Sequence, residues 1–356
     1  MAGTLGQIPS HRVTPPDVFF NRRHFLSTVG SSLLAAPLAL SASARAVLAQ
    51  RQPSVIDVPF QRPEVFPAPR NESYALPRAV INAIPVLGGS SGQGDTKRLM
   101  AREISAKHNN FYEFLPGKGG PVWEFCGDFE VEPWTVEITG ECRRPRTLDL
   151  DDLFAFDHEE RVYHFRCVER WAMNVPWSGF PLRRLLESVE PTDHARFIQF
   201  ESAAVPDQMP GIRTAGWYPW PYREGLRIDE AMNELAFVVT GVYGEPLLRQ
   251  HGAPVRIIAP WKYGYKSPKS ITKIQLLRDH QTTFWQVEQP HEYGFLSNVN
   301  PNIPHPRWEQ NISYWLDTED QFLTPIFNGY ESYVAELYPD EPRSRQKPLQ
   351  PGQPAR

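Results

Sequence analysis

Short strand-like runs, with almost no long helical segment between them, constrain the fold of this chain more than any other feature. Apolar or alternating runs occur at 134–138, 161–167, 196–201, 235–243, 255–259 and 271–277. The helical patterns are brief, at 98–106, 148–154, 181–186 and 229–233. A doubly wound parallel sheet needs a crossover of about a dozen residues after each strand, usually a helix. The sequence therefore predicts an α+β fold with a mixed sheet.

Proline supports this interpretation, because 36 prolines among 356 residues are about twice the usual share. They predict fixed loops and turns between the regular elements. We expect four parts: an N-terminal segment at 1–49, a proline-rich arm at 50–104, one large domain at 105–340 and a flexible tail at 341–356. The glycine-rich stretch at 88–94 lacks the Gly-Lys-Ser/Thr sequence of a phosphate loop, so we interpret it as a flexible loop.

The N-terminal segment has the pattern of an export signal. Arg22 and Arg23 precede Phe25 and Leu26, and a mildly apolar stretch follows. Small residues at 42–49 then offer cleavage positions. Paired arginines before a short, weakly apolar run are typical of the twin-arginine route, which exports folded proteins. We expect the twin-arginine machinery to export this protein to the periplasm; an ordinary secretory signal or an amphipathic helix is the alternative.

Charge and hydropathy exclude two classes of partner. The formal net charge is −4, and residues 1–49 carry four arginines against one aspartate, so the rest of the chain is more acidic still. Nucleic-acid binding needs a basic surface, so we expect no nucleic-acid partner. Outside the signal, no apolar run is long enough to span a membrane, which predicts a soluble exported protein.

The chain has three cysteines, Cys126, Cys142 and Cys167, which are too few for a disulfide framework. We interpret Cys126 and Cys142 as ordinary, partly buried thiols, with a bond between them after export as the alternative. Cys167 differs, because it ends the strand-like run at 161–167 and no second cysteine or histidine stands at chelating spacing.

The surroundings of Cys167 leave three roles open. With a period of two, Cys167 shares a strand face with Tyr163 and Phe165. Arg166 and Arg170 would stabilise its thiolate, and Glu169 would oppose it. Such a thiol is a buried apolar filler, a nucleophile, or the single protein ligand of a metal that brings its other ligands with it. The rest of the chain favours the third role.

Several segments in the range 105–337 resemble the molybdenum-containing sulfite-oxidase family and, within it, the catalytic subunits of periplasmic protein-methionine-sulfoxide reductases. The resemblance includes the twin-arginine signal. The matching segments are 109–114, 166–182, 208–211, 224–232, 252–256, 260–264, 292–295 and 300–301. Each segment alone is weakly specific, but together and in this order they imply a sulfite-oxidase-type molybdopterin-binding fold at 105–340.

The resemblance also implies a cofactor and its contacts. One molybdenum is expected on molybdopterin, with Cys167 as the protein ligand and the other equatorial sulfurs from the cofactor. Pterin and phosphate contacts are implied at Asn109, Asn110, Tyr112, Glu113, Ser202, His251, Arg256, Ser267, Pro268 and Lys269. Amide, hydroxyl and cationic groups suit a pterin edge and a phosphate. Ser202 stands where the family has threonine, and His251 where the reductases often have asparagine, but both retain a hydrogen-bonding group.

Most of these residues have a simpler interpretation when the resemblance is set aside. The alternatives are helix caps for Asn109 and Asn110, a turn for His251, core rings for Tyr112 and Trp261, and surface charges for Arg256 and Lys269. The structure distinguishes these alternatives by showing where each side chain lies.

The implied reaction removes oxygen from methionine sulfoxide in oxidised periplasmic proteins, which repairs them. The chain has neither a Cys-x-x-Cys-His haem motif nor a dinucleotide fingerprint. The resemblance implies a membrane haem subunit, linked to quinol, as the electron donor. Glu169 is a candidate to hold a proton for the departing oxygen. Its alternative role is an ion pair with Arg166 or Arg170.

Two other functions remain as alternatives. A sulfite dehydrogenase on the same scaffold would favour cations around the metal, whereas Glu169 is a carboxylate close to Cys167. Too little chain follows the predicted domain for the dimerisation domain of sulfite oxidases. The other alternative is a non-enzymatic exported binding protein in which Cys167 is structural.

Overall fold

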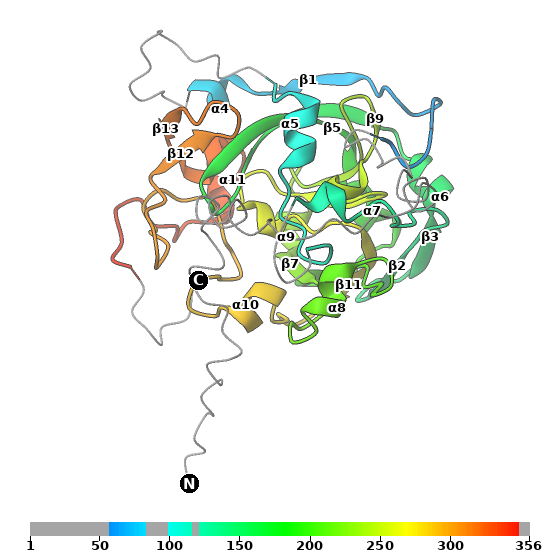
Figure 1. The fold of residues 1–356 in the computed structure, drawn as a ribbon. Coiled ribbons are helices and arrows are strands. Elements are labelled where there is room, and N and C mark those ends of the chain that lie inside the picture. Colours follow the sequence, from blue (N-terminus) through cyan, green and yellow to red (C-terminus); the bar gives the residue numbers. More distant parts are fainter. Residues whose placement is uncertain (1–56, 83–98, 116–120, 349–356) are drawn as a thin grey trace, which may run out of the picture. The chain divides into compact units, whose positions relative to one another are not determined.

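Two mixed β-sheets form the framework of the structure (Figure 1). The computed structural model describes residues 57–82, 99–115 and 121–348. These residues belong to one unit, Pro53–Arg356. The expected export signal at 1–49 and the glycine-rich stretch at 88–94 lie outside the described residues.

The larger sheet is eight-stranded among the described residues. Its main path runs through β1 (Arg70–Ala75), β4 (Glu159–Arg166), β5 (Trp171–Pro181), β12 (Ile312–Trp315) and β13 (Gln321–Leu323). The central strand β5 also pairs with β8 (Phe237–Val242), which in turn pairs with β9 (Glu245–Pro246) and β10 (Arg256–Ile258). The β1–β4 and β5–β12 pairs are parallel, and the β4–β5 and β5–β8 pairs are antiparallel.

The smaller sheet has five strands in the part of the chain that is described. The order is β3 (Arg146–Asp149), β2 (Thr135–Gly140), β11 (Ile271–Leu277), β6 (Phe197–Ser202) and β7 (Arg223–Arg227). Only the β2–β11 pair is parallel among these described strands. Both sheets are therefore mixed, and the predicted α+β class is confirmed.

The helices are short, and none of the described ones is both long and apolar enough to cross a membrane. The longest described α-helix, α7 (Leu182–Ser188), has seven residues, with Pro181 as its N-cap. The other α-helices are α4 (Arg78–Asn82), α5 (Arg102–Lys107), α6 (Leu150–Phe154), α8 (Pro210–Thr214), α9 (Ile228–Ala231), α10 (Phe284–Glu288) and α11 (Glu331–Val334). The 3-10 turns are η2 (Val122–Glu124), η3 (Arg249–His251), η4 (Gly264–Lys266), η5 (Ile326–Gly329) and η6 (Ala335–Leu337).

The strand β5 is the main element that the sequence pattern did not reveal. All eleven of its residues are buried, so its side chains show no alternation between apolar and polar positions. It also contains Pro176, a residue that normally argues against a central strand because it cannot donate a ladder hydrogen bond. The stretch at 148–154, predicted as a helix, is helical only from Leu150. Its first two residues belong to strand β3, and Asp149 then caps α6 in a capping box with Asp152.

The expected arm and tail both join the folded unit in part. Within the expected arm at 50–104, β1 adds to the edge of the larger sheet by pairing with β4. Within the expected tail at 341–356, the carboxylate of Glu341 accepts hydrogen bonds from Asn298 and Asn300. Chain segments with few sequence signals of their own are thus held by contacts with distant residues.

Candidate active site

Cys167 lies at the first position of a tight turn between β4 and β5. The Cys167 amide donates to the Trp171 carbonyl at 3.0 Å, and the Arg170 amide donates back to the Cys167 carbonyl at 2.9 Å. Arg170 closes the turn with a φ of +78°. The two central strands of the larger sheet therefore fix the thiol, which is only 7% exposed.

Two donors point at the Cys167 sulfur. They are the amide of Glu169 at 3.5 Å and the side-chain nitrogen of Asn110 at 3.7 Å. Burial raises the pKa of the thiol, and the Glu169 charge raises it further, while the Glu169 amide, Arg166 and Lys269 oppose this rise. A thiol held protonated in this way is a poor nucleophile, but a soft metal ion would deprotonate it on binding.

The Glu169 carboxylate faces the same space, held by two neutral donors. Its Oε2 accepts hydrogen bonds from Asn110 Nδ2 and from Trp171 Nε1, both at 3.1 Å. Arg166 turns to the opposite face of β4, where its Nε donates to Ser313 Oγ at 3.0 Å. Within the described residues, no ion pair joins Glu169 to Arg166 or Arg170, so the alternative structural role of Glu169 does not occur there.

Two cations lie close to each other in this part of the protein, the buried Arg256 and the half-buried Lys269. Arg256 is 3% exposed and donates to the carbonyls of His251 and Ser267 at 2.8 and 3.1 Å. Lys269 donates to the carbonyl of Asn110 at 2.9 Å and lies close enough to Cys167 to affect its ionisation. Neither cation forms an ion pair with a carboxylate among the residues that are described. The surface charge suggested as the alternative for Arg256 is therefore wrong, and Lys269 is half-buried with its amine turned to a backbone carbonyl.

Burial strongly disfavours these charges in the absence of a ligand. It lowers the pKa of Arg256 to about 9. It also lowers the pKa of Lys269, with Arg256 adding to the effect and the nearby Glu113 opposing it. Burial raises the pKa of Glu113, and Lys269 opposes that rise. Arg256 has no carboxylate partner among the described residues, and a buried cation of this kind is costly, so this arrangement predicts an anionic ligand.

Polar atoms without hydrogen-bond partners gather at the same place. Among the described residues they include both ring nitrogens of His251, the hydroxyl of Ser202, Arg256 Nε and Trp177 Nε1. Burial lowers the pKa of His251 to about 3, and the Arg256 charge contributes to this fall. Buried polar atoms are normally paired, so their clustering indicates a site for a polar ligand. Together with the two cations, they fit a pterin edge and a phosphate.

The backbone around Gly252 brings these side chains together. Gly252 has a φ of +100°, and a Cβ at this position would lie 2.7 Å from Cβ of Lys269. The Ser270 amide donates to the Gly252 carbonyl, and the Ala203 amide donates to the Ser270 carbonyl. Lys269 is thereby held against His251 on one side and against the end of β6, where Ser202 lies, on the other. Only glycine permits this close approach without strain.

Four of the predicted cofactor contacts make other interactions within the protein; they are Asn109, Tyr112, Ser267 and Pro268. Asn109 Nδ2 donates to the carbonyls of Ser105 and Ala106, which makes Asn109 the helix-terminating residue of the alternative interpretation. Asn110, by contrast, reaches Cys167 and Glu169. The Ser267 hydroxyl accepts from the Ala259 amide, the Pro268 carbonyl accepts from the Ile257 amide, and the Tyr112 ring packs edge-on against Trp285 at 5.4 Å.

Three aromatic residues belong to the site although they were not among the predicted site residues. Trp171 holds Glu169, as described above. The rings of Trp177 and Phe165 face Arg256, whose guanidinium carbon lies 5.2 and 5.8 Å from their centres. Trp177 also contacts the His251 ring edge-on at 5.8 Å. Aromatic residues in strands usually pack the core, so only the polar partners of these rings reveal the additional role.

Other buried charges are structural rather than part of this site. Lys262 pairs with Glu230 at 2.7 Å and Lys266 pairs with Glu224 at 2.5 Å, and all four side chains are fully buried. Trp261, interpreted as a possible core ring, is fully buried and donates to the Tyr338 hydroxyl at 2.8 Å. These pairs satisfy one another and need no ligand.

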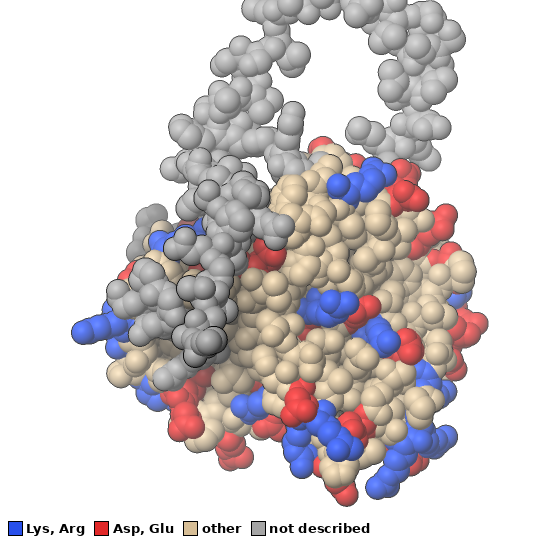
Figure 2. All heavy atoms as spheres, turned by 90° about the horizontal axis from the view of Figure 1, so that it is seen from below, with Lys and Arg blue, Asp and Glu red and all other residues tan. Residues whose placement is uncertain are grey.

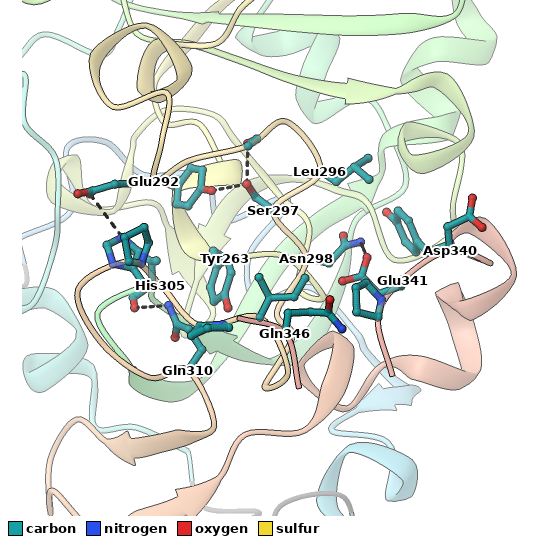
Figure 3. A pocket seen from close by; sticks show the side chains of 18 of the residues that line it. Tyr263, Glu292, Leu296, Ser297, Asn298, His305, Gln310, Asp340, Glu341 and Gln346 are labelled. Carbon is teal, nitrogen blue, oxygen red and sulfur yellow. Dashed lines mark hydrogen bonds and ion pairs between the residues drawn. The ribbon is translucent and has the colours of Figure 1, made fainter. Parts of the chain in front are cut away.

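A separate cavity of about 510 Å³ has Val168, from the turn after β4, in its lining (Figure 3). Tyr263, Glu292, His305 and Gln310 line it together with residues from the C-terminal segment. None of the predicted site residues contributes to its lining. This cavity is therefore distinct from the site around Cys167.

The other two cysteines do not form a bond with each other, because all three cysteines are free. Cys126 is buried, and its thiol lies 3.8 Å from Gln250 Oε1. Cys142 is half-buried. The interpretation of both as ordinary thiols agrees with this arrangement.

Comparison with known proteins supports the same assignment. The model of the oxidoreductase molybdopterin binding domain matches residues 124–285, a range that contains Cys167, His251, Arg256 and Lys269. The chain is 42% identical over 337 residues to the protein-methionine-sulfoxide reductase catalytic subunit MsrP of Burkholderia mallei (strain ATCC 23344), covering 93% of each chain. Among solved structures, the sulfane dehydrogenase SoxCD from Paracoccus pantotrophus matches with a TM-score of 0.39 and 15% identity, over 61% of this chain and 60% of that chain, which is too distant to inform function.

The identity to the Burkholderia protein extends over nearly the whole length of both chains, and the matched domain includes the buried thiol and the two cations. This chain belongs to the family of protein-methionine-sulfoxide reductase catalytic subunits, which are oxidoreductases with a molybdopterin-binding domain.

Proposed function

We propose that this protein reduces methionine sulfoxide in proteins at a molybdenum–molybdopterin centre, with Cys167 as the only protein ligand of the metal. One observation carries the proposal: a fixed, buried thiol lies close to Lys269, and Lys269 lies close to the buried Arg256, and neither cation has a carboxylate within ion-pair distance among the described residues. A thiolate ligand and an anion-binding pocket are what a molybdenum–dithiolene–phosphate cofactor requires. The relationship to the Burkholderia reductase supplies the substrate class.

The residues divide into those that would hold the cofactor and those that would face the substrate. Arg256 and Lys269 would bind the phosphate, while Ser202, His251 and Trp177 offer unpaired polar atoms to the pterin. When bound, the cofactor supplies the two-electron chemistry of oxygen-atom transfer. The protein fixes the thiol, excludes water by burying it, and holds the Glu169 carboxylate beside it.

Glu169 is suited to hold a proton near the reacting group. Asn110 and Trp171 both donate to the same oxygen, Oε2, so they orient the carboxylate and leave its second oxygen as the position that takes up or releases a proton. Removing oxygen from a sulfoxide consumes protons as well as electrons. A carboxylate fixed two residues from the metal ligand is placed to deliver one.

Glu169→Gln is expected to lower kcat by about 100-fold, because a glutamine accepts the same two hydrogen bonds but cannot exchange a proton. Turnover of the wild type and of the variant would be compared between about pH 5 and 9, with the two proteins matched in bound molybdenum. The matched control is Glu130→Gln, an exposed carboxylate, which should keep the wild-type profile. Full turnover across this pH range in the Glu169 variant would remove the proton role.

We also propose a location and an electron donor. The arginine pair at 22–23 and the following apolar stretch support export of the folded, cofactor-loaded protein to the periplasm by the twin-arginine machinery. The sequence carries no haem or dinucleotide motif, so a separate donor is needed. The family resemblance supports a membrane haem subunit that draws electrons from quinol.

Sulfite oxidation is the second candidate, because Lys269 near Cys167 and Arg256 near Lys269 would also attract a dianionic substrate. The deciding experiment uses protein purified from molybdate-supplied cells. About one molybdenum per chain is expected by mass spectrometry, with reduction of a methionine-sulfoxide peptide by a reduced dye and no oxidation of sulfite. Sulfite oxidation without sulfoxide reduction would reverse the assignment, and absence of molybdenum would refute both candidates.

A further inference from the structure

Arg166 carries a buried positive charge directly before Cys167 in the chain. It is the last residue of β4 and is 0% exposed. Its three guanidinium nitrogens donate to Ser313 Oγ at 3.0 Å, to the Cys167 carbonyl at 3.1 Å and to the Gln310 carbonyl at 3.4 Å. All three partners are neutral, and no carboxylate pairs with Arg166 among the described residues. The hydrogen-bonding groups of this arginine are therefore satisfied, but its charge is not balanced.

A second arginine of the same strand shows the difference. Arg161 is equally buried, but it forms ion pairs with Glu159 and, at 2.9 Å, with Glu234. Burying a cation without an ion-pair partner is costly. Packing of the strand alone therefore does not explain why β4 encloses an unbalanced charge at its last residue.

The charge of Arg166 acts on the Cys167 sulfur. Burial lowers the pKa of the guanidinium, and Tyr263 and Cys167 oppose this fall. The effect is mutual, because Arg166 opposes the rise in the pKa of the Cys167 thiol that burial and Glu169 cause. Tyr263 contributes the face of its ring, whose centre lies 5.2 Å from the guanidinium carbon. A metal-bound thiolate at Cys167 would supply the negative charge that the described residues do not.

Water does not screen this charge as it screens the charges on the surface. In Figure 2, Lys and Arg side chains lie among Asp and Glu side chains on the outside of the protein, where solvent and salt weaken their fields. Arg166 has no contact with solvent. The field of a buried charge is stronger at a given distance, because the effective dielectric constant of the interior is lower than that of water.

We propose that the charge of Arg166 raises the reduction potential of the metal bound to Cys167. The inference rests on the proposed function, which consumes two electrons and two protons to convert a sulfoxide to a thioether and water. Each electron that enters the centre adds negative charge near the guanidinium, and a fixed positive charge stabilises the more negative, reduced form. Arg166 acts through Cys167 and contacts no substrate, so it is a positioning residue.

A redox titration of the cofactor-loaded protein, followed by paramagnetic resonance, tests the role of the charge. In Arg166→Gln, the equilibrium constant for adding one electron to the partly reduced metal should fall about tenfold, which is about 59 mV for a one-electron couple. Arg166→Lys removes the fork of donors but keeps the charge, so it should keep most of the wild-type potential. An unchanged potential in Arg166→Gln would overturn the proposal. An equal fall in both variants would also overturn it, since hydrogen bonds to the turn would then set the potential.

A second pair of variants balances the charge while Arg166 stays in place. Ser313 is fully buried, and its hydroxyl accepts from Arg166 and lies 2.7 Å from Thr324 Oγ1. Ser313→Asp places a carboxylate against the guanidinium and should lower the potential as Arg166→Gln does. Ser313→Asn introduces a side chain of the same size without the charge and should keep the wild-type potential. This pair decides the question even where Arg166→Gln does not fold, and equal potentials in its two members would refute the proposal.

The wild-type protein separates this inference from the proposed function. Wild-type protein without molybdenum would overturn both. Wild-type protein that contains molybdenum but does not reduce methionine sulfoxide would overturn the proposed function alone, and the redox titration would still decide the role of Arg166. Active wild-type protein, with its potential unchanged in Arg166→Gln and in Ser313→Asp, would overturn only the role of Arg166.

Discussion

Cys167→Ser is expected to lower methionine-sulfoxide reduction by more than about 100-fold while the protein remains folded, because loss of a metal ligand exceeds the 10- to 100-fold cost of losing an outer-shell partner. Serine keeps the size and the donors around position 167, including the Glu169 amide and Asn110. It removes the soft sulfur ligand. The paramagnetic resonance signal of the partly reduced metal should disappear or change its hyperfine pattern, and circular dichroism should be unchanged.

Cys126→Ser provides the matched control. Cys126 is buried like Cys167, and burial raises the pKa of its thiol to about 12. Its thiol contacts Trp123 and Gln250 and does not lie at the site with Arg256 and Lys269. This variant should keep its molybdenum, its resonance signal and its turnover. A normal signal in Cys167→Ser together with a lost signal in Cys126→Ser would move the ligand assignment to Cys126.

The position of Cys167 could be predicted because it depends on local sequence. A strand with a period of two places Tyr163 and Phe165 on one face, and Cys167 follows as the first residue beyond β4. The ring of Phe165 faces Arg256 inside the site, and Arg166 contacts Ser313 on the opposite face, as alternation requires. The strands β6 and β11 were predictable because they alternate, and β8 and β10 because they are short, continuous apolar runs.

Other features of the fold and of the site could not be predicted, because they depend on contacts between distant parts of the chain. Strand β5 was hidden by its complete burial and its prolines. Arg256 and Lys269 look like surface cations in sequence, since nothing local shows that the fold encloses them. The family resemblance selected them, and the structure adds the physical reason. The difference between Asn109 and Asn110 was likewise invisible, because one residue decides which side chain ends a helix and which reaches the thiol.

Arg256→Met is expected to reduce cofactor retention about 10- to 100-fold, which corresponds to the 1.5–3 kcal/mol of a hydrogen bond to a charged group. The apoprotein should remain folded, because two opposing effects largely offset each other. The change leaves the carbonyls of His251 and Ser267 without a donor, and it also removes a buried cation that has no ion-pair partner among the described residues. Molybdenum content and guanidinium unfolding of protein made without molybdate measure the two quantities separately.

Lys266→Met is the contrasting variant, because Lys266 is equally buried but pairs with Glu224. Breaking that pair leaves a buried carboxylate and should destabilise the apoprotein by about 3–5 kcal/mol. Any cofactor loss in Lys266→Met should then follow the loss of folded protein. Cofactor loss in Arg256→Met should occur in protein that is still folded. If both variants lose cofactor only in proportion to their stability, Arg256 is a structural cation and the anion site must be placed elsewhere. If Arg256→Met alone loses cofactor, the phosphate that Arg256 binds explains why it is buried without a carboxylate partner among the described residues.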